Sequence, residues 1–139
     1  MNMQNQIDTV DCKQVASIAA IQVKPNPNNA YVVFPPPGAF ILDSNGQGVH
    51  LPFGNTFVVI IDPLFYASIN AITETISHEI VESMTNPNYD TPAFLTKKYV
   101  VDTGDEIVDT CAVTKDFNSV LNGINVGRYW SNQDGGCWP

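Results

Sequence analysis

Residues 66–87 read YASINAITETISHEIVESMTNP and contain the one long helical pattern of the chain. Isoleucines recur in it at helical spacing, which predicts a helix over residues 66–85 with one apolar face. These isoleucines are Ile69, Ile72, Ile76 and Ile80. We expect the helix to end before Pro87, because the residue that precedes a proline disfavours the α region.

A second face of this helix carries polar side chains. His78 and Glu82 are four positions apart, so at about 100° per residue they share a face, which Glu74 joins one turn earlier. That face lies about 160–200° from the isoleucines, so we expect the isoleucines to pack on a sheet while His78 and Glu82 point towards a cleft. An imidazole and a carboxylate one turn apart suit zinc, and Glu79 could act as the base for an attacking water. The alternative is a solvated acidic helix face.

The segments before the helix predict strands. Residues 31–34 are β-branched and aromatic and are followed by three prolines, which indicates a strand that leads into a stiff loop. Residues 56–61 form the clearest buried strand, which ends at Asp62. Residues 40–42 and 49–51 predict a hairpin around an Asn-Gly turn at residues 45–46.

The segments after the helix are shorter. Residues 99–101 and 107–108 predict short strands, and Asn122-Gly123 predicts a final hairpin that runs to Trp130. Strands, one helix and then irregular strands indicate an α+β fold with a mixed sheet. We expect a single domain over residues 1–139, with residues 1–14 as a frayed start.

Composition excludes some partners. The chain has 139 residues, with 14 Asp and Glu against 6 Lys and Arg, and a formal net charge of −8. Nucleic acids and anionic membrane surfaces require clustered basic side chains, so neither is an expected partner. The longest apolar run, residues 57–61, is far shorter than a membrane span, and residues 1–51 show no signal-peptide pattern.

Three cysteines, Cys12, Cys111 and Cys137, allow at most one intrachain disulfide. Their spacing favours Cys111 with Cys137, and the alternative is three free thiols. Such a bond would stabilise the fold by roughly 3 kcal/mol. A disulfide together with few charged residues favours a secreted or extracellular protein, or one from a virion.

Several motifs together resemble a known family. The motifs are His78-Glu79-x-x-Glu82 followed by Asn86-Pro87, Glu106-Ile107-x-Asp109-x-Cys111, and Trp130 before Cys137. In this order they resemble the zincin-like domain of secreted bacterial and fungal proteins and of plant phosphate-induced (EXORDIUM-like) cell-wall proteins. The resemblance covers roughly residues 28–139, and residues 31–34 and 48–50 also match it. The helix motif by itself is similar to the His-Glu-x-x-His helix of zinc metalloproteases.

The resemblance implies a divalent metal, zinc first, held by His78 and Glu82 with Glu79 as the base. Asp109 is the first choice for a third ligand, and Glu106 follows it. His50 is a further ligand or a substrate-side donor, or else an exposed loop histidine. A site with one histidine and several carboxylates shifts the preference towards calcium, manganese or magnesium relative to zinc.

The expected function is a metal-dependent hydrolase, first of all a zinc peptidase that acts on a peptide or protein. The alternative is a non-catalytic, metal-stabilised binding or structural module of an extracellular or virion protein. In that case Trp130 and Trp138 could stack on a carbohydrate or cell-wall ligand, unless they pack on the disulfide.

Overall fold

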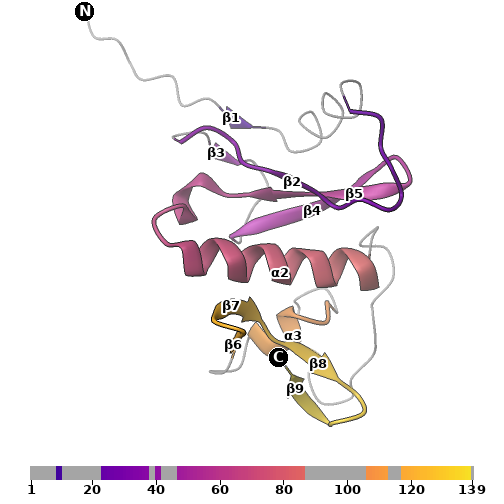
Figure 1. The fold of residues 1–139 in the computed structure, drawn as a ribbon, viewed down its shortest axis with the longest axis vertical. Helices are drawn as coiled ribbons and strands as arrows, with labels where there is room; N and C mark the ends of the chain where they lie inside the picture. The colour runs from indigo at the N-terminus through magenta and orange to yellow at the C-terminus, as the bar shows by residue number, and fades with distance from the viewer. Residues whose placement is uncertain are drawn as a thin grey trace, which may run out of the picture.

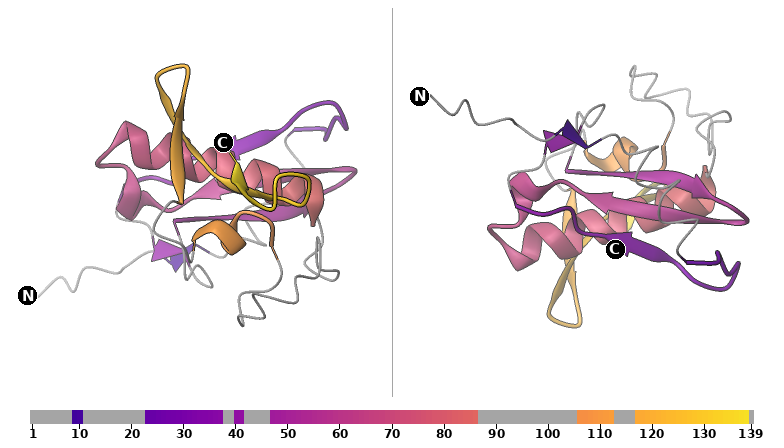
Figure 2. Two further views of the ribbon diagram at one scale, coloured as in Figure 1. Left: turned by 90° about the horizontal axis from the view of Figure 1, so that it is seen from below. Right: turned by 90° about the horizontal axis from the view of Figure 1, so that it is seen from above.

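The computed structural model describes residues 9–10, 23–37, 40–41, 47–86, 106–112 and 117–138. They form a mixed α+β fold with small sheets, one long helix and one disulfide. The long helix, α2 (Ile69–Thr85), lies between a three-stranded sheet and the C-terminal strands (Figure 1). In the view from below, the C-terminal strands lie in front of α2, and in the view from above, the three-stranded sheet lies in front of it (Figure 2). The two therefore cover opposite sides of the helix.

The three-stranded sheet has the order β2-β5-β4. β2 (Tyr31–Val33) runs parallel to the central strand β5 (Thr56–Ile61), and β4 (Gly48–Phe53) runs antiparallel to it. Phe53, Val58 and Ile60 form its apolar core, and the ring of Tyr31 packs edge-on against Phe53 with the ring centroids 5.1 Å apart. The predicted strands at residues 31–34 and 56–61 are confirmed.

The predicted hairpin between residues 40–42 and 49–51 is wrong. β3 (Phe40–Ile41) instead pairs in parallel with β1 (Thr9–Val10), and β4 pairs with β5 through a turn at Gly54. Gly54 has a φ of +62°, which a glycine adopts at little cost, so a tight two-residue turn forms there. The predicted turn at residues 45–46, the strand at residues 99–101 and Cys12 lie outside the described residues.

The long helix begins three residues later than predicted and ends as predicted. Residues Pro63–Phe65 form a short 3-10 helix, η1, and Asp62 caps it by accepting a hydrogen bond from the backbone N of Leu64. This cap separates β5 from α2, so α2 begins at Ile69. No helix among the described residues is long and apolar enough to cross a membrane.

The expected apolar face of α2 is wrong. The buried residues of the helix are Thr75, Glu79, Glu82 and Ser83. By contrast, Ile69 is 71% exposed, and the other three isoleucines are only half-buried. The physical reason is that α2 is covered from two sides, by β4 and β5 and by β7 (Ile124–Gly127). Polar side chains can be buried there because they have partners: Glu79 contacts His50 on β4, and Glu82 accepts a hydrogen bond from the backbone N of Asp109.

The C-terminal part begins with a turn rather than the strand predicted at residues 107–108. This turn leads into a short helix, α3 (Asp109–Ala112). β6 (Asn118–Leu121) and β7 form the predicted hairpin, which ends at Gly127 rather than at Trp130, and its turn residues Asn122 and Gly123 have φ values of 52° and 82°. β8 (Tyr129–Ser131) then pairs with β9 (Gly136–Trp138). The backbone N of Gly127 donates to Ser77 Oγ at 2.8 Å, which fixes β7 on α2.

Candidate metal centre

Six ionisable side chains converge between the sheet, α2 and the start of α3. They are His50 from β4, His78, Glu79 and Glu82 from α2, Glu106 from the turn before α3, and Asp109 from α3 itself. Every residue that the sequence analysis named as a metal ligand, base or additional ligand is therefore in this centre. Glu74, the other acidic residue on the predicted helix face, instead accepts a hydrogen bond from Asn118 Nδ2.

His78, Glu82 and Asp109 form the first part of the centre. His78 Nε2 lies 3.0 Å from Glu82 Oε2 and 3.2 Å from Asp109 Oδ1. Ligand atoms that surround one zinc ion at about 2.0–2.1 Å are about 3.0–3.4 Å apart, so the distance from His78 Nε2 to each of the two carboxylates matches that spacing. The backbone N of Asp109 donates to Glu82 Oε1 at 3.1 Å, which holds α3 against the helix.

His50 belongs to the second part of the centre. It is fully buried in β4, so the interpretation as an exposed loop histidine is wrong. Its Nδ1 lies 3.1 Å from Glu79 Oε2, and its Nε2 lies 3.1 Å from the backbone O of Asn86. The same Nε2 is 3.6 Å from Glu106 Oε1. The pairing of His50 with Glu79 was not predicted from the sequence.

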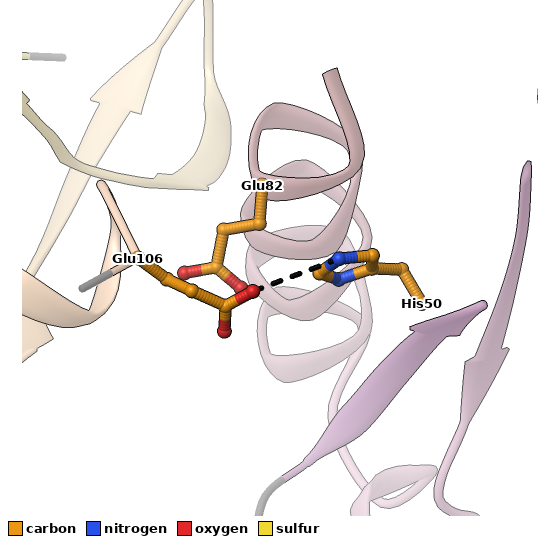
Figure 3. A group of neighbouring side chains, drawn as sticks. All are labelled: His50, Glu82 and Glu106. Atoms are coloured by element: carbon orange, nitrogen blue, oxygen red, sulfur yellow. Dashed lines mark ion pairs between the residues drawn. The ribbon is translucent and has the colours of Figure 1, made fainter. Parts of the chain in front are cut away.

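Two groups of donor atoms in this centre are compact enough to hold a cation. One is His78, Glu79 and Glu82, the other is His50, Glu82 and Glu106, and within each group the ligand atoms lie within 4.8 Å of one another. Figure 3 shows the second group, with side chains that reach one point from the strand, the helix and the turn. Glu82 is common to both groups, and Asp109 belongs to neither. Glu106 Oε1 is buried and has no hydrogen-bond partner among the described residues.

The electrostatics of the centre favour a cation. Burial lowers the pKa of His78, but hydrogen bonds to Asp109 and Glu82 outweigh this and raise it to about 10. Burial and the charge of Glu82 raise the pKa of Glu106 to about 7, and burial also raises the pKa of Glu82. No lysine or arginine in the described part of the chain forms an ion pair with these carboxylates. The excess negative charge and the nitrogen and oxygen donors therefore fit a divalent ion.

Solvent reaches the centre from one side. The side chains of His50 and Glu82 are 1% and 2% exposed, whereas those of His78 and Asp109 are 24% and 34% exposed. Catalytic metal sites keep one coordination position open, while structural sites are closed by protein ligands. The exposed edge at His78 and Asp109 is where a small molecule could approach.

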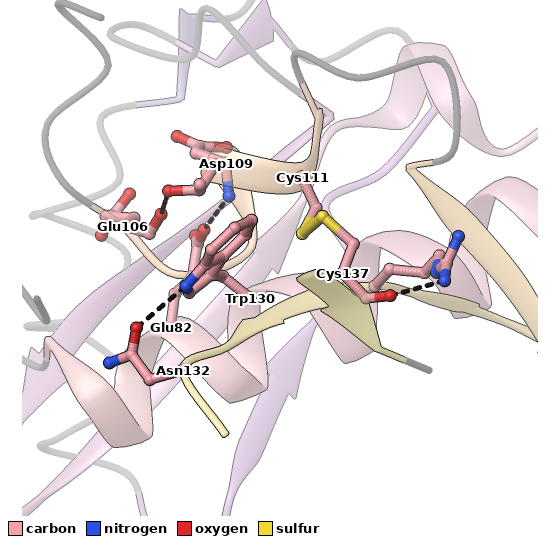
Figure 4. The surroundings of a disulfide bond; sticks show 9 residues. Glu82, Glu106, Asp109, Cys111, Trp130, Asn132 and Cys137 are labelled. Atoms are coloured by element: carbon pink, nitrogen blue, oxygen red, sulfur yellow. Dashed lines mark hydrogen bonds between the residues drawn. A yellow bond between two sulfur atoms is a disulfide. The ribbon is translucent and has the colours of Figure 1, made fainter. Parts of the chain in front are cut away.

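The predicted disulfide between Cys111 and Cys137 is confirmed, and it connects α3 to β9. Figure 4 shows that one of its cysteines, Cys111, lies on the same short helix as Asp109. The backbone N of Trp130 donates to the backbone O of Ile107, which also fixes the start of α3. Trp130 is half-buried, whereas Trp138 is 52% exposed. The disulfide between Cys111 and Cys137 therefore restrains the backbone that carries Asp109. Its presence is consistent with an oxidising compartment.

Comparisons of the chain with protein-family models, with curated proteins and with solved structures found no match. The resemblance to the zincin-like domain stays a prediction that rests on the motifs.

Proposed function

We propose that this chain is a metal-dependent hydrolase in which His78, Glu82 and Asp109 hold one divalent ion and Glu79 is the general base. The observation that carries the proposal is the approach of His78 Nε2 to two carboxylates at 3.0 and 3.2 Å, inside a centre with excess negative charge. Zinc is the first choice of ion, because it accepts both imidazole nitrogen and carboxylate oxygen.

The ion would supply Lewis acidity, because a bound divalent cation lowers the pKa of water and polarises a carbonyl group. Glu82 is buried and is held by the backbone N of Asp109, so it cannot easily turn away from His78. Asp109 is more exposed and completes the set from the solvent side. These residues suit the ion because His78 Nε2 lies 3.0 and 3.2 Å from the two carboxylates, which form no ion pair with a lysine or arginine in the described part of the chain.

Glu79 has the position that a general base requires. It follows His78 directly and belongs to the same compact group, and its side chain is 9% exposed. His50 Nδ1 contacts Oε2 of its carboxylate and so fixes the orientation of the side chain. The proposal assigns the other oxygen, Oε1, to the proton of the attacking water. A positioned general base contributes about 10²–10⁴-fold to a rate.

A peptide is the substrate class that the surrounding fold supports. His50 lies on β4, which among the described residues pairs with only one strand of its sheet, β5. Extended peptides commonly bind along such an edge through main-chain hydrogen bonds. The second candidate, a non-catalytic carbohydrate-binding module, is favoured by the 52% exposure of Trp138, since exposed indole rings stack on sugars.

The test is hydrolysis of a quenched fluorescent peptide library by the protein loaded with Zn²⁺. We expect cleavage that EDTA abolishes and that Glu79→Gln lowers at least 100-fold while the variant still binds the ion. Glu74→Gln is the matched control on the same helix and should keep full activity, because Glu74 contacts Asn118 outside the centre. Absence of cleavage by the loaded wild type, with binding of oligosaccharides that Trp138→Ala removes, would favour the second candidate. Full activity in Glu79→Gln would refute the assignment of the base.

A further inference from the structure

We propose that the centre holds a second divalent cation, bound by His50 Nε2, Glu106 and Glu82, so that the carboxylate of Glu82 is shared by two ions. This inference extends the proposed function, which requires only the ion at His78. It rests on the second compact donor group, which contains neither His78 nor Asp109.

The carboxylate partner of His50 Nδ1 is one that a metal-ligating histidine has. Such a histidine almost always donates one ring N–H to a carboxylate, a backbone carbonyl or a water, which orients the other nitrogen towards the ion. In this structure Nδ1 lies 3.1 Å from Glu79 Oε2. The other nitrogen, Nε2, lies 3.1 Å from the backbone O of Asn86 and 3.6 Å from Glu106 Oε1, with Glu82 beside them (Figure 3). An ion at Nε2 would replace the proton of its hydrogen bond to Asn86. Glu79 thus orients His50 for the second ion.

Two buried residues next to His50, Glu106 and Asn86, have side-chain atoms without a hydrogen-bond partner among the residues that the structure describes. Glu106 Oε1 is buried and accepts no hydrogen bond within the described part of the chain, where His50 Nε2 is its ion-pair partner at 3.6 Å, and a buried carboxylate oxygen without a hydrogen bond is costly. The side chain of Asn86, a residue only 1% exposed, has no hydrogen-bond partner among the described residues either. The backbone O of Asn86 lies 3.1 Å from Nε2 and is itself an oxygen donor for a cation. A cation at this point would satisfy Glu106 Oε1 directly.

Two divalent ions balance the formal charge of the centre once its histidines have lost their protons. Its four carboxylates, with neutral imidazoles, carry a formal charge of −4, so one divalent ion leaves −2 and two ions leave none. They belong to Glu79, Glu82, Glu106 and Asp109. Four carboxylates and two histidines are also the donor set of the two-metal carboxylate centres in helical bundles. Glu82 can serve both ions because Oε2 faces His78 while the same carboxylate lies within the His50 group.

The experiment is equilibrium dialysis of the chelator-treated protein against Zn²⁺, with metal and protein measured on the same samples. We expect two ions per chain for the wild type. Glu106→Gln should bind one ion, because an amide of the same shape replaces the carboxylate at the second site only. Asp109→Asn should also bind one, because it weakens the first site only. Glu74→Gln, which lies outside both donor groups, should bind two.

The outcomes separate this inference from the proposed function. One ion in the wild type that Glu106→Gln keeps and Asp109→Asn loses would overturn the second site and leave the proposed function intact. One ion that both variants lose would indicate a single shared ion and would also overturn the second site. Two ions that persist in Glu106→Gln and in His50→Asn would place the second ion elsewhere, which contradicts the inference. Circular dichroism of each variant checks that the fold is retained.

Discussion

The metal-free protein should become less stable as the pH rises from 6.5 towards 10. Folding raises the pKa of His78 from 6.5 to about 10, because Asp109 and Glu82 hold its proton. A group with a raised pKa contributes its full stability below the pKa of the unfolded chain and loses it as the pH rises through the folded pKa. The pH window of this loss is therefore 6.5 to 10.

The magnitude follows from the same two values. At about 1.4 kcal/mol per pH unit, a change from 6.5 to about 10 corresponds to an upper limit of about 5 kcal/mol. His78 is 24% exposed and Asp109 is 34% exposed, so solvent screens their interaction. We expect on the order of 2–3 kcal/mol to remain after this discount. Glu106 also lowers the stability as the pH rises, but between about 4.5 and 7. Folding raises its pKa from 4.5 to about 7, so ionisation of this buried carboxyl disfavours the folded state.

The assay is urea unfolding of the EDTA-treated protein at pH values from 6.5 to 9.5, followed by tryptophan fluorescence. His78→Gln is the control, because it removes the titrating ring and keeps every other group that titrates in this range. The wild type should be more stable than His78→Gln at pH 6.5, and this difference in the free energy of unfolding should shrink by about 2–3 kcal/mol as the pH rises to 9.5. A bound ion should reverse the trend, since metal binding releases the proton of His78. Equal pH slopes in the wild type and in His78→Gln would refute the reasoning.

Three further predictions concern the surroundings of the centre. Glu106→Gln should stabilise the metal-free protein by about 1 kcal/mol above pH 7, since the amide carries no buried charge, and a lower urea midpoint would contradict this. Replacement of both Cys111 and Cys137 by serine should lower the free energy of unfolding by about 3 kcal/mol, because the bond closes a loop with a separation of 26 residues; unchanged thermal melting would be inconsistent with that. Gly48→Ala should destabilise the fold by about 1–3 kcal/mol, because its new β-carbon would lie 2.7 Å from a side-chain carbon of α2. The matched Gly136→Ala, whose β-carbon meets nothing within 4 Å, should stay within about 0.5 kcal/mol of the wild type in the same melts.

Local patterns predicted the parts of the fold that depend on neighbouring residues. The end of α2 follows from Pro87, and the β6–β7 hairpin follows from Asn122 and Gly123, which adopt the positive φ values of such a turn. Helical spacing also placed His78 and Glu82 on one face, and the structure brings them to 3.0 Å. The third member, Asp109, followed from the family resemblance rather than from spacing.

The parts that failed depend on contacts between distant segments. Helical periodicity favoured the isoleucines as the buried face, but Glu79 and Glu82 are buried because β4 and β7 cover α2 from two sides. The contact between His50 and Glu79 joins residues 29 positions apart and depends on the register of β4 on β5, which no local pattern reveals. A signal was present, because a lone histidine in a strand that precedes an acidic helix is a candidate partner for that helix.

Anomalous X-ray diffraction from crystals grown with Zn²⁺ tests the central claim most directly, because it locates the ion without reference to activity. The account predicts a zinc peak within about 2.0–2.2 Å of His78 Nε2 and of carboxylate oxygens from Glu82 and Asp109. Absence of a peak at this position in a well-ordered crystal, with the His78 ring still hydrogen-bonded to both carboxylates, would contradict it.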